Sequence, residues 1–231
     1  MNHKKLKYRT GFSILLLIML NMSLSASGQN EMENKEMDNK KDAVPGEMEN
    51  REGFETAVFA GGCFWGVEAV FESLKGVEDV MSGYSGGDAE TASYYTIGSG
   101  KTGHAEAVEI IYNPDILSFK TLLDVFFSVA HDPTQLNYQG PDVGSQYRSV
   151  VFYTSEDQKM ITLKAIEELE STKVLNSKIV TEVIPLDTFY PAEDYHQDFM
   201  KLNPDHPYIQ YWDKPKIEEL EKKYPDLINK M

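Results

Sequence analysis

The segment Gly61–Gly66, with the sequence GGCFWG, decides how this chain folds around its one reactive thiol. It holds Cys63, the only cysteine among 231 residues. An apolar run over residues 56–60 precedes it, and an amphipathic stretch over residues 67–74 follows it. This pattern predicts a strand, a glycine turn and a helix, with the thiol on the first helical turn. Because free N–H groups and the helix dipole favour an anion there, we expect Cys63 to be shifted toward thiolate and to act as a nucleophile.

Residues 1–28 have the three-part layout of a secretory signal peptide. Four basic residues ending at Arg9 precede an apolar run over residues 12–22, which is too short to cross a bilayer comfortably. Small polar residues follow, and Ala26 and Gly28 suit the positions before a cleavage site. The alternative is an uncleaved signal anchor. We therefore expect an exported protein, either periplasmic or secreted.

Residues 29–53 are rich in Glu, Asp, Lys, Asn and Met. Three copies of the motif Glu-Met-acid-Asn place Met32, Met37 and Met48 in this stretch. Such a composition cannot bury a core, so it predicts a disordered, solvated tether. Residues 54–231 are then expected to form a single catalytic domain.

The chain carries a formal net charge of −15. Four positive charges in the signal peptide are balanced by four net negative charges in the tether, so the domain itself carries the whole excess. An acidic surface of this kind disfavours nucleic acid and anionic membranes as partners. We expect no nucleic-acid partner and no stable membrane association after signal cleavage.

The order of apolar patterns predicts a mixed α/β domain with a partly antiparallel sheet. Strands are expected at residues 56–60, 77–84, 104–112, 149–153 and 179–184. Helices are expected at residues 67–74, 118–130 (capped by Ser118), 155–171 (opened by a Ser155–Gln158 capping box), 191–202 and 215–223. The polar stretches at residues 88–103 and 131–146 are predicted loops, which often carry functional groups.

A thiolate needs a proton donor and groups that hold an oxygen if it is to act on an oxidised or acyl substrate. Glu106 lies between two alanines on an apolar strand, where its neutral form is favoured, so it is a candidate general acid. The alternative is that Glu106 faces solvent on a half-exposed strand. Tyr94 and Tyr147, on the two predicted loops, are candidate hydroxyl donors or ordinary packing residues.

Other groups near the motifs leave their roles open. Phe64 and Trp65 could line an apolar pocket or pack in the core. No spacing selects a partner for a Cys–His dyad among His104, His131 and His196. One cysteine and scattered histidines make no metal-ligand cluster, so no metal site is expected, and no dinucleotide or phosphate fingerprint is present.

Five motifs, in order along residues 56–204, make the sequence similar to peptide methionine sulfoxide reductase A. They are Gly62-Cys-Phe-Trp-Gly-Val-Glu68, Gly103-His-Ala-Glu-Ala-Val108, His131-Asp-Pro133, Gln146-Tyr-Arg-Ser149 and Tyr190-Pro-Ala-Glu-Asp-Tyr-His-Gln197. The resemblance implies a compact two-layer α/β sandwich with a mixed β-sheet, flanking helices and a ferredoxin-related core. It also implies reduction of the S epimer of methionine sulfoxide, free or in proteins, as protein repair after oxidative damage.

The resemblance also implies a role for each matching residue. The family's nucleophile falls on Cys63, its acid on Glu106, and its oxygen-binding tyrosines on Tyr94 and Tyr147. Its aromatic pocket for the substrate methyl group falls on Phe64 and Trp65, and an acidic substrate-positioning residue falls on Asp142.

One departure from the family pattern concerns the cysteines. Many members carry resolving cysteines near the C-terminus, whereas this chain has none and resembles the single-cysteine branch. The resemblance then implies a Cys63 sulfenic acid that an external thiol reduces, with no bound cofactor. That thiol would be thioredoxin-like, glutaredoxin-like or a small molecule, and we expect a monomer. The alternatives are another thiol enzyme, such as a peroxidase-like scavenger or a Cys–His hydrolase, and a non-enzymatic exported binding domain with a buried thiol.

Overall fold

The computed structural model describes residues 52–229. The predicted signal peptide, residues 1–28, lies outside the described residues. The same holds for residues 29–51 of the predicted tether, which include its three methionines.

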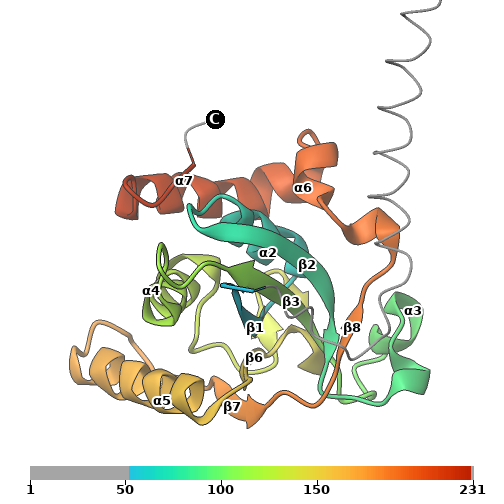
Figure 1. The fold of residues 1–231 in the computed structure, drawn as a ribbon. Coiled ribbons are helices and arrows are strands. Elements are labelled where there is room, and N and C mark those ends of the chain that lie inside the picture. The colour runs from blue at the N-terminus through green and yellow to red at the C-terminus, as the bar shows by residue number, and fades with distance from the viewer. Residues whose placement is uncertain (1–51, 230–231) are drawn as a thin grey trace, which may run out of the picture. The chain divides into compact units, whose positions relative to one another are not determined.

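The strands within residues 52–229 form a six-stranded sheet in the order β7-β6-β1-β3-β2-β8 and a small β4–β5 hairpin (Figure 1). They are β1 (Glu55–Gly61), β2 (Val77–Ser85), β3 (Ala105–Tyr112), β4 (Tyr138–Gln139), β5 (Asp142–Val143), β6 (Ser149–Tyr153), β7 (Glu182–Pro185) and β8 (Phe189–Pro191). Neighbours in the large sheet pair antiparallel, except that β6 and β7 are parallel. The sheet is therefore mixed, and β1 lies inside it between β6 and β3.

The described residues also form helices. They are α2 (Phe64–Glu72), α3 (Tyr94–Ile97), α4 (Phe119–Val125), α5 (Glu156–Ser171), α6 (Phe199–Leu202) and α7 (Lys214–Lys223), with short 3-10 or π segments η1 (Ala89–Thr91), η2 (Phe126–Ala130), η3 (Ser145–Tyr147), η4 (Asp194–His196) and η5 (Ile209–Asp213). Residues of α2, α4, α5 and α7 share one large core with Phe59 of β1, so these helices pack on one face of the sheet. The preceding strand residue, Val58, belongs to a smaller cluster built from strand residues. Neighbouring residues of a strand face opposite sides of the sheet.

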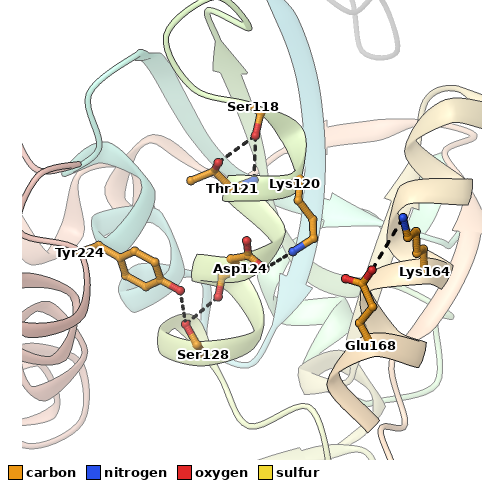
Figure 2. A network of polar contacts seen from close by, with 8 residues as sticks. All are labelled: Ser118, Lys120, Thr121, Asp124, Ser128, Lys164, Glu168 and Tyr224. Carbon is orange, nitrogen blue, oxygen red and sulfur yellow. Dashed lines mark hydrogen bonds and ion pairs between the residues drawn. The ribbon is translucent and has the colours of Figure 1, made fainter. Parts of the chain in front are cut away.

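The helix predicted over residues 118–130 begins as expected and then changes its winding. Ser118 caps α4 by accepting a hydrogen bond from Thr121 N at 3.1 Å, as Figure 2 shows. The helix continues as the π segment η2, where Ser128 Oγ lies 2.9 Å from Tyr224 Oη (Figure 2). This contact ties η2 to the end of α7. Ser128 of η2 therefore helps to hold the C-terminal helix in place.

The predicted two-layer α/β class with a mixed sheet and flanking helices is confirmed. The strand predicted at residues 149–153 is β6, and the Ser155 capping box opens α5 with a 3.2 Å hydrogen bond from Gln158 N. The last strand of the prediction, residues 179–184, is shifted to β7.

The helix predicted over residues 191–202 is wrong. This stretch ends β8, forms the short turn η4, and becomes helical only in α6. Side chains explain the difference: Gln197 accepts from Ser82 N at 2.9 Å and donates to Ser82 O at 3.0 Å, so it extends the edge of the sheet. Asp198 then adopts a left-handed backbone with φ of 52°, which stops a continuous helix. The predicted loop at residues 88–103 contains α3.

Candidate active site

Cys63 lies where β1 turns into α2. Gly62 makes the turn with φ of 93°, a backbone region that favours glycine. A Cβ there would also lie 2.6 Å from Gln139 Cγ, so the turn has no room for a side chain. Cys63 was predicted to lie on the first helical turn; it occupies the N-cap position, directly before that turn, and is 9% exposed. The thiol is thus held at a helix start with narrow access to solvent.

Glu106 takes the first free N–H group of that helix. The Phe64 N–H donates to Glu106 Oε2 at 3.1 Å, and Glu106 on β3 is 2% exposed. Burial raises the pKa of Glu106 to about 8, although the Phe64 hydrogen bond opposes the rise. The expected apolar setting of Glu106 is confirmed, and the solvent-facing alternative is excluded. Near neutral pH this carboxyl holds its proton.

The prediction that Cys63 is shifted toward thiolate is wrong for this structure. Burial raises the pKa of Cys63 well above its ordinary value, and the charges of Glu106 and Asp213 raise it further. The Trp65 backbone N–H and the charge of Lys216 lower it, but by less. The helix start does favour an anion, yet it is outweighed by desolvation and by the carboxyl groups packed opposite. The resting thiol is therefore neutral.

Tyr94 and Tyr147 bring phenol groups to the same place. Tyr94 begins α3 and Tyr147 ends η3, and both line a cavity of about 600 Å³ together with Glu106. Burial raises the pKa of each tyrosine, and the charges of Glu106 and Cys63 raise both further. Both hydroxyls are neutral donors on the side of the cavity that Glu106 occupies.

Phe64 and Trp65 follow the thiol, and both rings lie against His196. Phe64 is 1% exposed and its ring lies 4.9 Å from the ring of His196. Trp65 stacks on Phe199 at 3.7 Å with its plane tilted by 8°, and its Nε1 donates to His196 Nδ1 at 3.1 Å. The edge of Tyr208 also meets Trp65, at 5.7 Å. The two rings thus form an aromatic wall next to Cys63.

Asp142 belongs to the same group through a residue that the sequence analysis did not single out. Tyr208 Oη donates to Asp142 Oδ2, which links the β4–β5 hairpin to the segment before η5. Burial raises the pKa of Tyr208, and the charge of Cys63 is the next cause of the rise. Tyr208, Asp213 and Lys216 all lie C-terminal to the five sequence motifs. Only the Tyr- and Lys-rich composition of this C-terminal stretch could have drawn notice.

The histidines use their rings elsewhere. His131 contacts Phe126 O at 3.0 Å and Ser149 Oγ at 2.6 Å, and burial lowers its pKa to about 4. His104 Nε2 contacts Asp88 O at 3.0 Å, and His196 accepts from Trp65. These contacts give no support to a Cys–His hydrolase.

Two features of the described chain bear on cofactors and membranes. Within residues 52–229, no group of three or more His, Cys, Asp or Glu side chains is arranged to hold a metal ion. In the same residues no helix is long and apolar enough to cross a membrane.

A thiol at a helix N-cap, a protonated carboxyl bonded to the next residue, and two phenols that share a cavity with this carboxyl make a candidate site for thiol chemistry on an α/β scaffold. Residues 55–227 match the family of peptide methionine sulfoxide reductases. A "Peptide methionine sulfoxide reductase MsrA 2" of Mesorhizobium japonicum is 53% identical over 177 residues, covering 77% of this chain and 91% of the relative. One from Synechocystis is 52% identical over 176 residues, covering 76% and 82%.

Solved structures agree with these relatives. Reduced Mxr1 of Saccharomyces cerevisiae has a TM-score of 0.63 at 32% identity, covering 71% of this chain and 92% of that one. Methionine sulfoxide reductase A of Corynebacterium diphtheriae has a TM-score of 0.58 at 34% identity, covering 68% and 78%. The chain belongs to the peptide methionine sulfoxide reductase family and is an oxidoreductase.

Proposed function

We propose that this protein reduces the S epimer of methionine sulfoxide, free or in proteins, with Cys63 as the nucleophile and Glu106 as the acid. One observation carries the proposal. Glu106 has a pKa of about 8 and accepts from the N–H of the residue directly after Cys63, so a protonated acid lies beside the thiol at neutral pH. This pairing suits a substrate whose sulfur is attacked while its oxygen gains a proton.

The proposed step transfers one oxygen atom from the substrate sulfur to the Cys63 sulfur. Cys63 sulfur attacks the sulfoxide sulfur, Glu106 gives its proton to the oxygen, and Tyr94 and Tyr147 hold that oxygen by hydrogen bonds. The S–S bond so formed and the S–O bond of the sulfoxide both break as the oxygen passes to Cys63 sulfur, so methionine leaves reduced by two electrons and Cys63 sulfur is oxidised to a sulfenic acid. The proton of the Cys63 thiol restores Glu106.

Phe64, Trp65 and Asp142 supply substrate contacts in this proposal. The aromatic wall accommodates the methyl group of the substrate, since apolar surface favours an apolar group. Asp142, oriented by Tyr208, positions the substrate from the opposite side.

Two thiols from outside the chain complete the cycle. The first forms a mixed disulfide with the Cys63 sulfenic acid and releases water, and the second frees Cys63 as a thiol. We propose an external reductant of the thioredoxin-like, glutaredoxin-like or small-thiol class, because Cys63 is the only cysteine. The chain would meet it outside the cytosol, after export.

The test is a dithiothreitol-driven assay with the two separated epimers of a methionine sulfoxide peptide. The expected result is turnover of the S epimer alone, and none by Cys63→Ser. Without reductant, one equivalent of substrate should leave a sulfenic acid that dimedone traps on Cys63. Reduction by Cys63→Ser, or equal turnover of both epimers, would contradict the proposal.

A further inference from the structure

The C-terminal segment lies along the helix that carries the thiol. At its start, Asp213 is fully buried against Gly66 in the first turn of α2. At its end, Asn229 N donates to Ser73 O at 3.0 Å, and Lys75 N donates to Leu227 O at 2.7 Å, just beyond the end of α2. The segment is therefore fastened to α2 at both ends.

The contact at Gly66 is unusually close. A Cβ on Gly66 would lie 2.1 Å from Asp213 Oδ1 and 2.8 Å from Lys216 Nζ. Lys216 Nζ itself donates to Asp213 Oδ1 at 3.1 Å. An ion pair thus rests directly on the backbone three residues after Cys63, at a spot where only glycine leaves room for it.

Stability alone is a weak reason for this pair. Lys216 is about one-fifth exposed and Asp213 is not exposed at all, so folding removes most of their hydration. Desolvation of such a pair offsets much of the attraction between its partners, and apolar residues often serve as well. The location of the pair, next to free N–H groups of a helix start, points to an electrostatic role.

The groups that act on Cys63 come from several elements. They are Glu106 on β3, Tyr94 on α3, Tyr147 on η3, Tyr208 before η5, Asp213 on η5 and Lys216 on α7, and Asp142 on β5 is joined to them by its hydrogen bond from Tyr208. Glu106 and Asp213 oppose a negative charge on Cys63. Lys216 is the cation that opposes them, and it also lowers the pKa of Asp142.

We propose that Asp213 and Lys216 are positioning residues that set the ionisation of Cys63: Lys216 stabilises the thiolate, and Asp213 holds Lys216 against the start of α2. The proposal rests on the proposed role of Cys63 as the nucleophile. A cation fixed beside the first turn of α2 favours an anion on the sulfur at the start of that helix and adds to the helix dipole. The carboxylate that fixes it has the opposite effect on the sulfur, so the two residues have separable consequences.

The test measures how fast iodoacetamide alkylates Cys63 in the reduced full-length protein between about pH 6 and about pH 10, because only the thiolate reacts. Lys216→Met should slow alkylation about tenfold at neutral pH, which corresponds to a rise of about one unit in the pKa of Cys63. Asp213→Asn removes the negative charge but keeps a side-chain oxygen that can accept from Lys216, so it should speed alkylation by a similar factor. Lys216→Arg keeps the charge and should restore the wild-type profile, and Lys214→Met, on the exposed side of α7, should leave it unchanged.

Opposite shifts are the diagnostic result. A merely structural pair would move both variants in the same direction, by loosening α7, and such a result overturns the proposal, as does an unchanged profile in both. Urea unfolding of each variant reports whether it is folded. If Lys216→Met does not fold, Asp213→Asn decides alone, and a rise or no change in the pKa of Cys63 overturns the proposal.

This readout is independent of the proposed reaction. Alkylation needs no sulfoxide, so a wild-type protein that fails the epimer assay can still show the opposite shifts. Conversely, normal reduction of the S epimer with unshifted alkylation profiles would leave the proposed function standing and remove the role of Asp213 and Lys216.

Discussion

Two buried carboxyl groups lie at the helix α2. They are alike in burial and in pKa, but their neighbours differ. Glu106 faces the start of α2 and Glu68 belongs to the helix itself; they are 2% and 1% exposed. Burial raises the pKa of each to about 8. A raised pKa is therefore no mark of catalysis by itself.

The neighbours separate the two groups. Glu106 accepts from Phe64 N and lines a cavity with Tyr94 and Tyr147. Glu68 lies near Glu72, whose charge further raises the pKa of Glu68, and within residues 52–229 its Oε1 has no hydrogen-bond partner. In the proposed reaction Glu106 delivers a proton to the substrate, whereas Glu68, kept protonated at neutral pH mainly by burial, has no part in it.

The largest expected effect distinguishes these two acids by activity. Glu106→Gln keeps the acceptor for Phe64 N–H but cannot deliver a proton, so kcat should fall about 10²- to 10³-fold. In wild type, activity should decline as the pH rises through about 8, where Glu106 loses its proton. Steady-state assays with the S epimer across pH measure both effects. Glu68→Gln is the matched control. An equal loss of kcat in this variant would mean that Glu106 has no specific role as the acid.

The next effect concerns the close approach at the start of α2. Gly66→Ala places a methyl group on the Asp213–Lys216 pair, so the free energy of unfolding should fall by about 1–3 kcal/mol. Urea unfolding measures the change. Gly98→Ala is the control, since its Cβ would meet atoms no nearer than 3.5 Å. Equal stability of the two variants would mean that Asp213 and Lys216 can move away from the added methyl group at little cost.

The tyrosines should matter less than the acid. Removing one hydroxyl removes one hydrogen bond to the substrate oxygen, so Tyr147→Phe and Tyr94→Phe should each lower kcat/KM about tenfold. Tyr95→Phe, next to Tyr94 but 95% exposed, should behave as wild type. The assay with the S epimer applies again. If only Tyr95→Phe lost activity, Tyr94 and Tyr147 would not be the residues that bind the substrate oxygen.

The sequence predicted the parts of this fold that depend on local pattern. Apolar runs located β1 and β6, and the Ser118 and Ser155 caps located α4 and α5, because periodicity and capping are short-range effects. The three-residue strand β8 was missed because it depends on pairing with β2, which no local pattern shows.

The site divides in the same way. Motifs pointed to Cys63 and Glu106, and the structure brings them together. The ionisation of Cys63 was predicted in the wrong direction, because it depends on Asp213 and on burial, and neither is visible near residue 63 in the sequence. Contacts between segments about 150 residues apart arise only when the chain is folded.

The smallest expected effect tests Glu68 by stability. Its folded-state pKa of about 8 lies above its ordinary value of 4.5, so between these pH values the folded state keeps a proton that the unfolded state releases. The unfolded state therefore gains as the pH rises, and wild-type stability should fall across this window. Glu68→Gln removes the titration, so urea unfolding at about pH 5 and about pH 8 should show its stability relative to wild type rising by about 1–2 kcal/mol. Glu167→Gln, on the exposed side of α5, should show no such difference. If the stability of Glu68→Gln relative to wild type did not change between the two pH values, water would reach this carboxyl. Glu68 and Glu106 would then be alike in burial but not in pKa.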